Sequence, residues 1–277
     1  MTSPALPAAE NRSPSTQDPG ASAPEVATGP DRTAAEPGAE AGDIDVVDVR
    51  GSVVAFWHEW LKPFFILLTV LLTIRSVIID WNHVPTGSMK PSILEGDRIL
   101  VQKLAYDLRV PFTLRRVTAW GTPSRGDVVV FLSPEDGKRL VKRVVAVADD
   151  EVELRRNRLW INGRPAQYRR PDPNAANSLS TGERTGYQVI GESIGGEDHH
   201  PVMTRRWLGG RASFAPRTIA PGEVFVMGDN RDDSSDSRVF GPVPTERILG
   251  RATAIVASVD PDRRYLPRWD RFFLPLP

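Results

Sequence analysis

The sequence contains no cysteine, and this absence removes several kinds of chemistry at once. Without a thiol the chain cannot carry a disulfide framework, a cysteine nucleophile, a cysteine-ligated zinc ion or an iron–sulfur cluster. Histidine is scarce, with four residues, so the usual general base of a hydrolase has few possible positions. No charge sign is in excess: 35 Lys and Arg balance 35 Asp and Glu, which argues against a general nucleic-acid binder. The 277 residues suffice for one large or two modest folded units.

The N-terminal stretch, residues 1 to about 42, has few of the apolar residues that a core needs. Ala, Pro, Ser, Gly, Thr and Glu dominate it, and seven of the 25 prolines fall there. Such a composition buries too little apolar surface to offset roughly 1–2 kcal/mol of backbone entropy per ordered residue. Acidic residues outnumber basic ones by ten to four between Met1 and Lys62, which leaves the remainder net basic by six. We predict a disordered tail over residues 1–55, with no function placed in it.

One long apolar run is present, and it predicts a single transmembrane helix over residues 56–80. From Phe64 to Ile79 the main interruption is Arg75, whose long side chain can reach the lipid headgroups from near the helix end. Trp60 and Trp81 flank the run like an aromatic belt. The 22 residues that they bound would span about 33 Å as a helix, which matches a hydrocarbon core of ~30 Å. The alternative is a buried helix of a soluble domain.

The position of this run also indicates where the protein resides. A cleaved secretory signal is disfavoured, because the run begins far from the N-terminus and no small-x-small site follows it closely. We therefore expect the anchor to stay attached, which makes the chain a single-pass protein of the plasma membrane. A long domain that follows an anchor crosses the membrane regardless of its charge. The prediction is a cytoplasmic tail and an extracytoplasmic domain over residues 81–277.

Beyond the anchor the sequence changes to short runs rich in β-branched residues, separated by Gly, Pro and Asp. Such runs predict a mainly β, antiparallel domain. Residues 169–217 are polar and irregular, and they predict a loop-rich insertion with few strands inside a non-catalytic subdomain over about 150–225. The expected strands are 98–102, 127–131, 140–147, 159–161, 224–227 and 252–259.

A serine just after the anchor is the first candidate for chemistry. Ser88 lies in the turn-forming segment Pro85–Ser92, where Gly87 frees the backbone. An ordinary serine in a polar turn fits the same fragment, since a serine nucleophile also needs an adjacent base. None of the four histidines, His58, His83, His199 and His200, is well placed to be that base. The adjacent pair of histidines has no carboxylate or cysteine at helical ligand spacing, so we predict no metal site.

A lysine in a predicted strand offers a better base. Strand alternation places Lys142 on the same face as Leu140 and Val144, and this face is apolar if it is buried. Burial disfavours the charged ammonium and lowers its pKa, so a neutral amine near physiological pH becomes available to take a proton from Ser88. The alternative is an edge-strand lysine that blocks aggregation.

A third segment, Met227–Pro242, is dense in short polar side chains directly after an apolar run. A calcium loop of the EF-hand type does not fit, because neither possible register puts Gly and Glu at the required positions. A solvated Asp-rich turn remains open. The other interpretation is a structural network in which Asp229, Asp236 and Arg238 support a site.

Together these segments resemble the bacterial type I signal peptidases, membrane-bound serine proteases with a Ser/Lys dyad. The resemblance rests on four blocks in the same order after one anchor, and it extends from the anchor to about Val243. It implies an antiparallel β catalytic domain that removes signal peptides from secreted preproteins after small-x-small motifs, without a metal or cofactor. The blocks are PTGSMKPSILEGDRILVQK from Pro85, RGDVVVF from Arg125, LVKRVVA from Leu140 and MGDNRDDSSDSR from Met227.

The resemblance also implies roles for individual residues. Ser88 would be the nucleophile and Lys142 the general base, while the hydroxyl of Thr86 and the backbone N–H of Ser88 would form the oxyanion hole. Ser234 would orient the lysine amine. The implied supporting network is Arg143, Asp229, Asp236 and Arg238, with the last two as an ion pair; the implied substrate-binding residues are Val84, Met89, Ile93, Ile99, Val130 and Val141. Family members often have Ser at the position of Thr86 and an aromatic–Ile pair at Leu140–Val141.

The expected partners are secretory preproteins, membrane lipid and the secretion translocase, with no nucleic acid. Two other functions remain open at this point. A self-cleaving Ser/Lys peptidase of the repressor type shares the chemistry, although the anchor and the absence of a DNA-binding helical region count against it. A membrane-tethered binding module without activity is the other, and such a protein should have lost Ser88 or Lys142, whereas this chain retains both.

Overall fold

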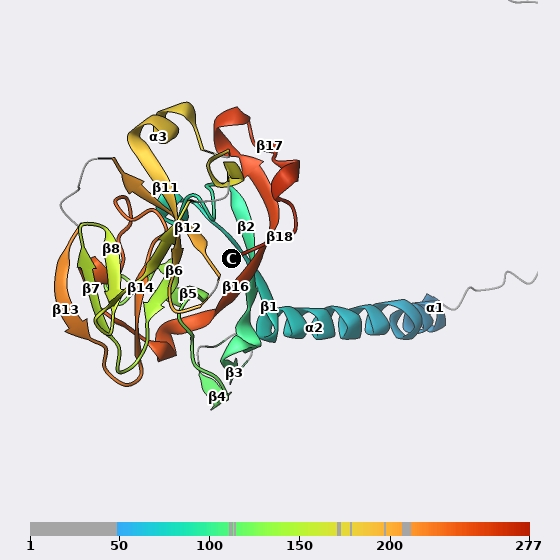
Figure 1. The fold of residues 1–277 in the computed structure, drawn as a ribbon. Coiled ribbons are helices and arrows are strands. Elements are labelled where there is room, and N and C mark those ends of the chain that lie inside the picture. Colours follow the sequence, from blue (N-terminus) through green and yellow to red (C-terminus); the bar gives the residue numbers. More distant parts are fainter. Residues whose placement is uncertain are drawn as a thin grey trace, which may run out of the picture. The chain divides into compact units, whose positions relative to one another are not determined.

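The described part of the chain begins with a long helical stretch. The computed structural model describes residues 49–277, except 111–112, 114, 171–172, 178, 197 and 207–211, so the predicted tail up to residue 48 lies outside it. Helix α1 (Val49–Phe56), a π-helical turn (Trp57–Leu61) and α2 (Lys62–Val77) follow one another directly (Figure 1). The helix thus begins before the predicted residue 56, and it ends before residue 80 because the chain enters strand β1 (Ile79–His83).

The helical stretch has the properties of a membrane segment. Residues Val53–Arg75 are long and apolar enough to cross a bilayer. Their side chains are not covered by the described domain: Trp60 is 69% and Leu67 65% exposed. The hydroxyls of Thr69 and Thr73 donate to the carbonyls four residues earlier, at 2.7 and 2.8 Å, which satisfies these polar groups inside the helix. A buried helix of a soluble domain is therefore not what the structure shows.

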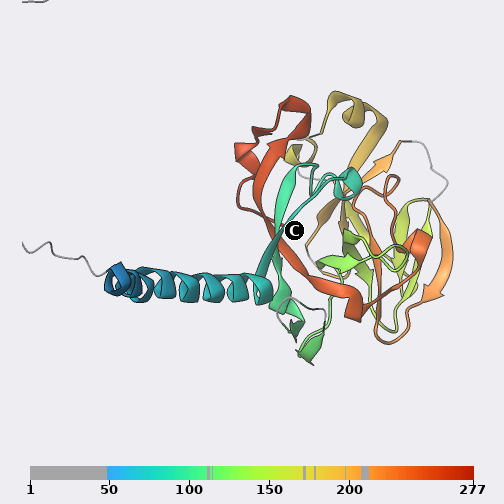
Figure 2. The ribbon, with the colours of Figure 1, turned by 180° about the vertical axis from the view of Figure 1, so that it is seen from behind.

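The domain that follows the helical stretch is built on a nine-stranded sheet whose pairings are all antiparallel. Its order is β1-β2-β16-β5-β6-β14-β15, with β17 and β18 paired to β16. Figure 2 shows the long C-terminal strand β16, in orange-red, beside the teal β2. The further bounds are β2 (Asp97–Gln102), β5 (Val128–Leu132), β6 (Arg139–Ala146), β14 (Glu223–Met227), β15 (Val243–Pro244), β16 (Ile248–Asp260), β17 (Leu266–Pro267) and β18 (Leu274–Pro275).

Three smaller sheets complete the described domain. They are the pair β3 (Asp107–Arg109) and β4 (Arg116–Ala119), the sheet β13-β7-β8-β9, and the sheet β10-β11-β12. Their strands are β7 (Glu151–Arg155), β8 (Arg158–Ile161), β9 (Arg164–Pro165), β10 (Gln167–Arg169), β11 (Tyr187–Ser193), β12 (His200–Arg205) and β13 (Phe214–Thr218). Short α-helices are α3 (Thr181–Gly186) and α4 (Ser237–Phe240). The mainly antiparallel β fold with one N-terminal apolar helix is therefore confirmed.

The expectation of few strands in residues 169–217 is wrong. Strands β11 and β12 pair over six positions, from Tyr187 with Arg205 to Glu192 with His200, and β13 joins the sheet of β7. Cross-strand pairing and packing of Val202 and Met203, each 1% exposed, stabilise strands that the polar composition does not reveal. The region is an ordered part of the domain where it is described.

Strand alternation places the two faces of the main sheet in different apolar clusters. In β5, Val128 and Val130 pack in one cluster, and Val129 and Phe131 in another. The opposing strand β6 sends Lys142 to the side of Val144, while Val141 packs against the first cluster. Strand β6, which carries Lys142, is thus packed against apolar side chains on both of its faces.

Candidate active site

Ser88 lies in a loop that the main sheet holds at both ends. After β1, the N–H of Val84 donates to the Asp97 carbonyl at 2.9 Å, and the N–H of Gly96 donates back to Val84 at 3.0 Å. The loop between them contains a 3₁₀ turn, Gly87–Met89. Met89 is fully buried beside Ser88, so the apolar core fixes the turn that presents the hydroxyl.

Lys142 reaches this serine from strand β6. Its Nζ lies 2.5 Å from the Oγ of Ser88, although the residues are 54 positions apart in sequence. The lysine is 2% exposed, and burial lowers its pKa to about 8, while the carboxylates of Asp236 and Asp229 act in the opposite direction. A sizeable fraction of the amine is therefore neutral near physiological pH, as a base that activates a serine requires.

The Asp-rich segment that follows β14 packs directly against the Ser88 turn. The backbone N–H of Asn230 donates to the Ser88 carbonyl at 3.1 Å, and the Asn230 side chain donates to the Gly87 carbonyl at 3.2 Å. This side chain thus helps to position the turn, a role that sequence reasoning missed although Asn230 lies inside the fourth matched block. Its position directly after Asp229 in that block was the only available signal.

Two buried ion pairs support this segment. Arg143 donates to both carboxylate oxygens of Asp229 at 2.9 Å, and Ser92 donates to the same carboxylate at 2.5 Å. Burial alone would raise the pKa of Asp229, but the charge and hydrogen bonds of Arg143 lower it, so the aspartate stays ionised. Because Arg143 follows Lys142 in β6, this pair ties the strand of the lysine to the segment after β14, and the hydrogen bond from Ser92 joins that segment to the loop that holds Ser88.

The second pair joins Asp236 and Arg238, as the sequence predicted, with N–O distances of 2.7 and 2.8 Å. Asp236 also accepts from the N–H of Gly228 at 2.9 Å. Burial raises the pKa of Asp236, but Arg238 more than offsets this and the net direction is downward, with a further lowering from the hydroxyl of Ser234. Ser234 is 2% exposed, and its hydroxyl lies against Gly228.

A cavity of about 470 Å³ opens onto Ser88 and Lys142. Thr86, the predicted oxyanion residue, is exposed on its wall. The region predicted as a non-catalytic subdomain also lines it, through Glu183, Tyr187 and Met203. Other lining residues are Gly87, Lys90, Glu95, Leu140, Asn230, Asp233 and Ser235.

The structure brings the six predicted substrate-binding residues together, but mostly as core. Val84, Met89, Ile93, Ile99 and Val130 are at most 3% exposed and belong to one apolar cluster, against which the half-buried Val141 packs. None of the six lines the cavity at Ser88. As core, they support the strands and the Ser88 turn and do not line the cavity that opens onto the serine.

Buried charges connect residues 150–225 to this site, a feature that the sequence did not reveal. Glu192 of β11 forms an ion pair with Arg231, and both side chains are at most 1% exposed. His200 lies 3.5 Å from the same carboxylate, and Tyr168 donates to it at 2.6 Å. Among the described residues no group of three or more His, Cys, Asp or Glu side chains could hold a metal ion, so His199 and His200 are not brought into such a group.

Gly228 allows the closest approach in the site, and its replacement is expected to be costly. A Cβ there would meet the Ser234 hydroxyl, the Ser88 carbonyl oxygen and, at 2.6 Å, the Ser234 Cβ. We expect Gly228→Ala to displace the Ser88 turn and to lower kcat/KM by about 10²-fold, measured by cleavage of a labelled peptide. The control is Gly182→Ala, because nothing lies within 4 Å of a Cβ there. Equal activity of the two variants would contradict the described approach.

A serine hydroxyl in contact with a desolvated lysine, on an antiparallel β domain behind an apolar helix, is the arrangement that a Ser/Lys hydrolase requires. The profile of the family described as signal peptidase, peptidase S26, matches residues 57–257. The chain is 36% identical over 231 residues to signal peptidase I of Pseudomonas aeruginosa and 35% identical over 229 residues to that of Pseudomonas fluorescens, covering 77% of each partner in both comparisons. The chain therefore belongs to the signal peptidase family and is a peptidase of the hydrolase class.

Two further similar proteins are a relative and a solved structure. Signal peptidase I of Haemophilus influenzae is 27% identical over 270 residues, with 78% of this chain and 74% of that protein covered. A crystal structure of a signal peptidase I from Enterococcus faecalis is 28% identical, with a TM-score of 0.30, over 48% of this chain and 98% of that one.

Proposed function

We propose that the protein removes signal peptides from preproteins with Ser88 as nucleophile and Lys142 as general base. The observation that carries the assignment is the 2.5 Å distance between Nζ and Oγ, with the amine buried. Family membership supplies the substrate class, and the geometry supports the residues. A membrane-tethered binding module would have no need of a desolvated lysine against a serine.

In the proposed reaction, neutral Lys142 takes the hydroxyl proton of Ser88 as Oγ attacks the scissile carbonyl. The backbone N–H of Ser88 and the hydroxyl of Thr86 stabilise the negative charge that develops on the carbonyl oxygen. The ammonium then gives its proton to the amine of the mature chain, which leaves. Lys142 next activates a water that hydrolyses the ester on Ser88, which releases the signal peptide and restores the hydroxyl. The steps need no metal or cofactor.

The remaining predicted residues act on the dyad through its surroundings. Arg143 with Asp229, and Arg238 with Asp236, neutralise buried charges and hold the loop segments next to Ser88. Ser234 lies beside Gly228 on the same loop and is proposed to orient the lysine amine. Asn230 is added to this group by its two hydrogen bonds to the turn.

Activity should rise with pH as Lys142 loses its proton. The lysine pKa is lowered to about 8, and the neutral form is the base, so log kcat/KM should rise with a slope of one up to about pH 8 and then level off. The test is the rate of peptide cleavage between about pH 6 and 10. A flat profile, or a rate that still rises at pH 10 as the ordinary lysine value of 10.5 would require, would contradict Lys142 as the base.

Recognition should depend on small side chains one and three positions before the cleaved bond. The apolar cluster that holds Val84 and Met89, on either side of the Ser88 turn, consists mainly of closely packed Val and Ile, and an extended substrate sends alternate side chains to the same side. Bulky residues at these two positions would overfill a shallow, tightly packed surface. Cleavage after a small-x-small motif follows.

The apolar helix and the family indicate a membrane-anchored protein. We further assign residues 1–55 as a cytoplasmic tail, 56–80 as the anchor in the plasma membrane and 81–277 as the extracytoplasmic peptidase domain. Membrane lipid and the secretion translocase are the proposed neighbours there, since the nucleophile follows the helix by few residues.

Protease added to intact spheroplasts is expected to digest the peptidase domain and to spare the tail. The expectation follows from a signal peptide being cleaved on the outer side, after its apolar segment. Immunoblots with one antibody to the tail and one to the domain measure the outcome, and detergent-lysed cells are the control. Protection of the domain with loss of the tail would contradict the orientation.

A further inference from the structure

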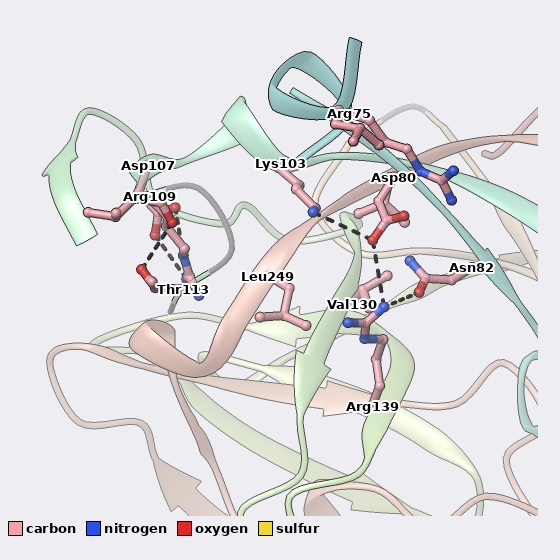
Figure 3. Close-up of a pocket in the computed structure, with 13 residues that line it drawn as sticks. Arg75, Asp80, Asn82, Lys103, Asp107, Arg109, Thr113, Val130, Arg139 and Leu249 are labelled. Carbon is pink, nitrogen blue, oxygen red and sulfur yellow. Dashed lines mark hydrogen bonds and ion pairs between the residues drawn. The ribbon is translucent and has the colours of Figure 1, made fainter. Parts of the chain in front are cut away.

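A second cavity, of about 460 Å³, lies on the main sheet (Figure 3). Five strands that are consecutive in the sheet, β1, β2, β16, β5 and β6, line it. They contribute Asp80 and Asn82, Val101, Leu249, Val130 and Arg139. The membrane helix adds Leu72 and Arg75, so the cavity lies where the chain leaves that helix.

This cavity is connected to the candidate site through an apolar cluster, although it shares no lining residue with the cavity at Ser88. Val130, which lines it, belongs to the same cluster as Val84 and Met89, on either side of the Ser88 turn. Arg139 precedes Lys142 by three residues in β6, which corresponds to about 10 Å along a strand. Because the two residues are an odd number of positions apart, their side chains lie on opposite faces of the strand, with Arg139 on the face of Val141. An extended substrate that pairs with the edge of β6 at Lys142 sends alternate side chains to the face of Val141 and reaches Arg139 about three residues away.

The helix side of the dyad is the side from which a signal peptide arrives. Its apolar segment lies in the bilayer and precedes the cleaved bond. In lipid every backbone polar group must be satisfied within the segment, so that segment is helical. Its last turn leaves up to four carbonyls without helical partners and carries a partial negative charge.

The charges and the floor of the cavity complement such a helix end. The Nζ of Lys103 lies 3.5 Å from the Asp80 carboxylate, and Arg139 lies 3.7 Å from the same group while donating to Asn82. Two cations thus flank one carboxylate (Figure 3), and Arg75, whose guanidinium lies 4.6 Å from the centre of the Trp81 ring, also lines the cavity. Arg139 is half exposed, and the floor of Val101, Val130 and Leu249 is apolar.

We propose that this cavity is a subsite for the end of the signal peptide's apolar helix, upstream of the small-x-small motif. Lys103 and Arg139 donate to the terminal carbonyls, and an apolar side chain of the last turn rests on the floor. The subsite recognises the change from helix to extended chain, which signal peptides of different sequence share. This inference rests on the proposed function, because it places the substrate along β6.

A phospholipid is the competing occupant, since its phosphate would also bind cations above an apolar floor. The peptide is favoured because Val130 of this cavity belongs to the apolar cluster that also holds Val84 and Met89, on either side of the Ser88 turn. A lipid needs no connection to Val130, whereas a substrate must pass from the membrane to Lys142 along this route.

The test compares two substrates on the full-length protein in detergent. One is a preprotein with its complete signal peptide, and the other is a short peptide that begins three residues before the cleaved bond. The variants are Arg139→Glu and Lys103→Glu. Two are used so that the test can still be made with one of them if the other does not fold. The control is Arg155→Glu, an exposed arginine of β7 that is paired with Glu153.

Each cavity variant is expected to lower the ratio of kcat/KM for the long over the short substrate by about fivefold, and the control should leave the ratio unchanged. Equal losses on both substrates would overturn the subsite. A fall in the ratio that appears only in vesicles containing anionic lipid, and not in detergent, would assign the cavity to phospholipid instead. Failure of the dyad assignment is distinct, because it would appear as cleavage that survives replacement of Lys142.

Discussion

Lys142→Ala and Ser88→Ala each lower kcat/KM for a preprotein by about 10³-fold or more, while the protein stays folded and membrane-bound. The two groups act as one unit, because the hydroxyl is a weak nucleophile without the neutral amine at 2.5 Å. The double variant should be no slower than either single variant. Cleavage rates from gel densitometry of the preprotein and its product provide the measurement.

Lys138→Ala is the matched control for the lysine, because its side chain is 78% exposed just before the same strand. It should retain cleavage. Folding of every variant is checked by circular dichroism and by extraction from membranes only with detergent. Near-normal cleavage by folded Lys142→Ala would show that another group is the base.

Glu192→Gln should reduce the free energy of unfolding by about 3–5 kcal/mol. The change leaves the guanidinium of Arg231 buried without its charged partner. The stability lost when one partner of a buried ion pair is removed is much larger than for an exposed pair. Burial would raise the pKa of Glu192, but Arg231 and His200 lower it, so the carboxylate is ionised in the folded protein. Urea unfolding in detergent, followed by tryptophan fluorescence, measures the change.

The control for this experiment is Glu153→Gln, which removes the partner of Arg155, a side chain that is 57% exposed. We expect a much smaller loss there, because solvent screens the exposed pair. The double variant Glu192→Gln with Arg231→Met should recover part of the stability, because it no longer buries an unpaired charge. Equal effects of the two glutamine substitutions would contradict the buried pair.

The sequence predicted the features that depend on local pattern. Alternation in β6 places Lys142 on the buried face with Val144, and the β-branched runs correspond to β2, β5, β6, β8, β14 and β16. The apolar run predicted the helix, because a membrane segment needs a length of apolar chain that no other element of the sequence supplies.

Features that depend on contacts between distant segments were not predictable. Nothing in residues 169–217 indicates that Glu192 would meet Arg231, because the charge of each residue alone suggests an exposed side chain. Asn230 and Gly228 act through their contacts with the Ser88 turn, which exist only once β14 lies beside β6. The predicted pocket residues are mostly packed core, although Val130 also lines the second cavity. The sequence could not separate these cases, because an apolar side chain looks the same whether it lines a pocket or fills one.

The most direct test of the account is mass spectrometry of a preprotein incubated with the purified protein in detergent. The wild-type protein should produce two fragments whose masses sum to that of the preprotein plus one water, with the cut after a small-x-small motif at the end of the apolar segment. Ser88→Ala and Lys142→Ala should leave the preprotein intact. The same two fragments from folded Lys142→Ala, or a cut elsewhere in the wild-type reaction, would contradict signal-peptide removal by this dyad.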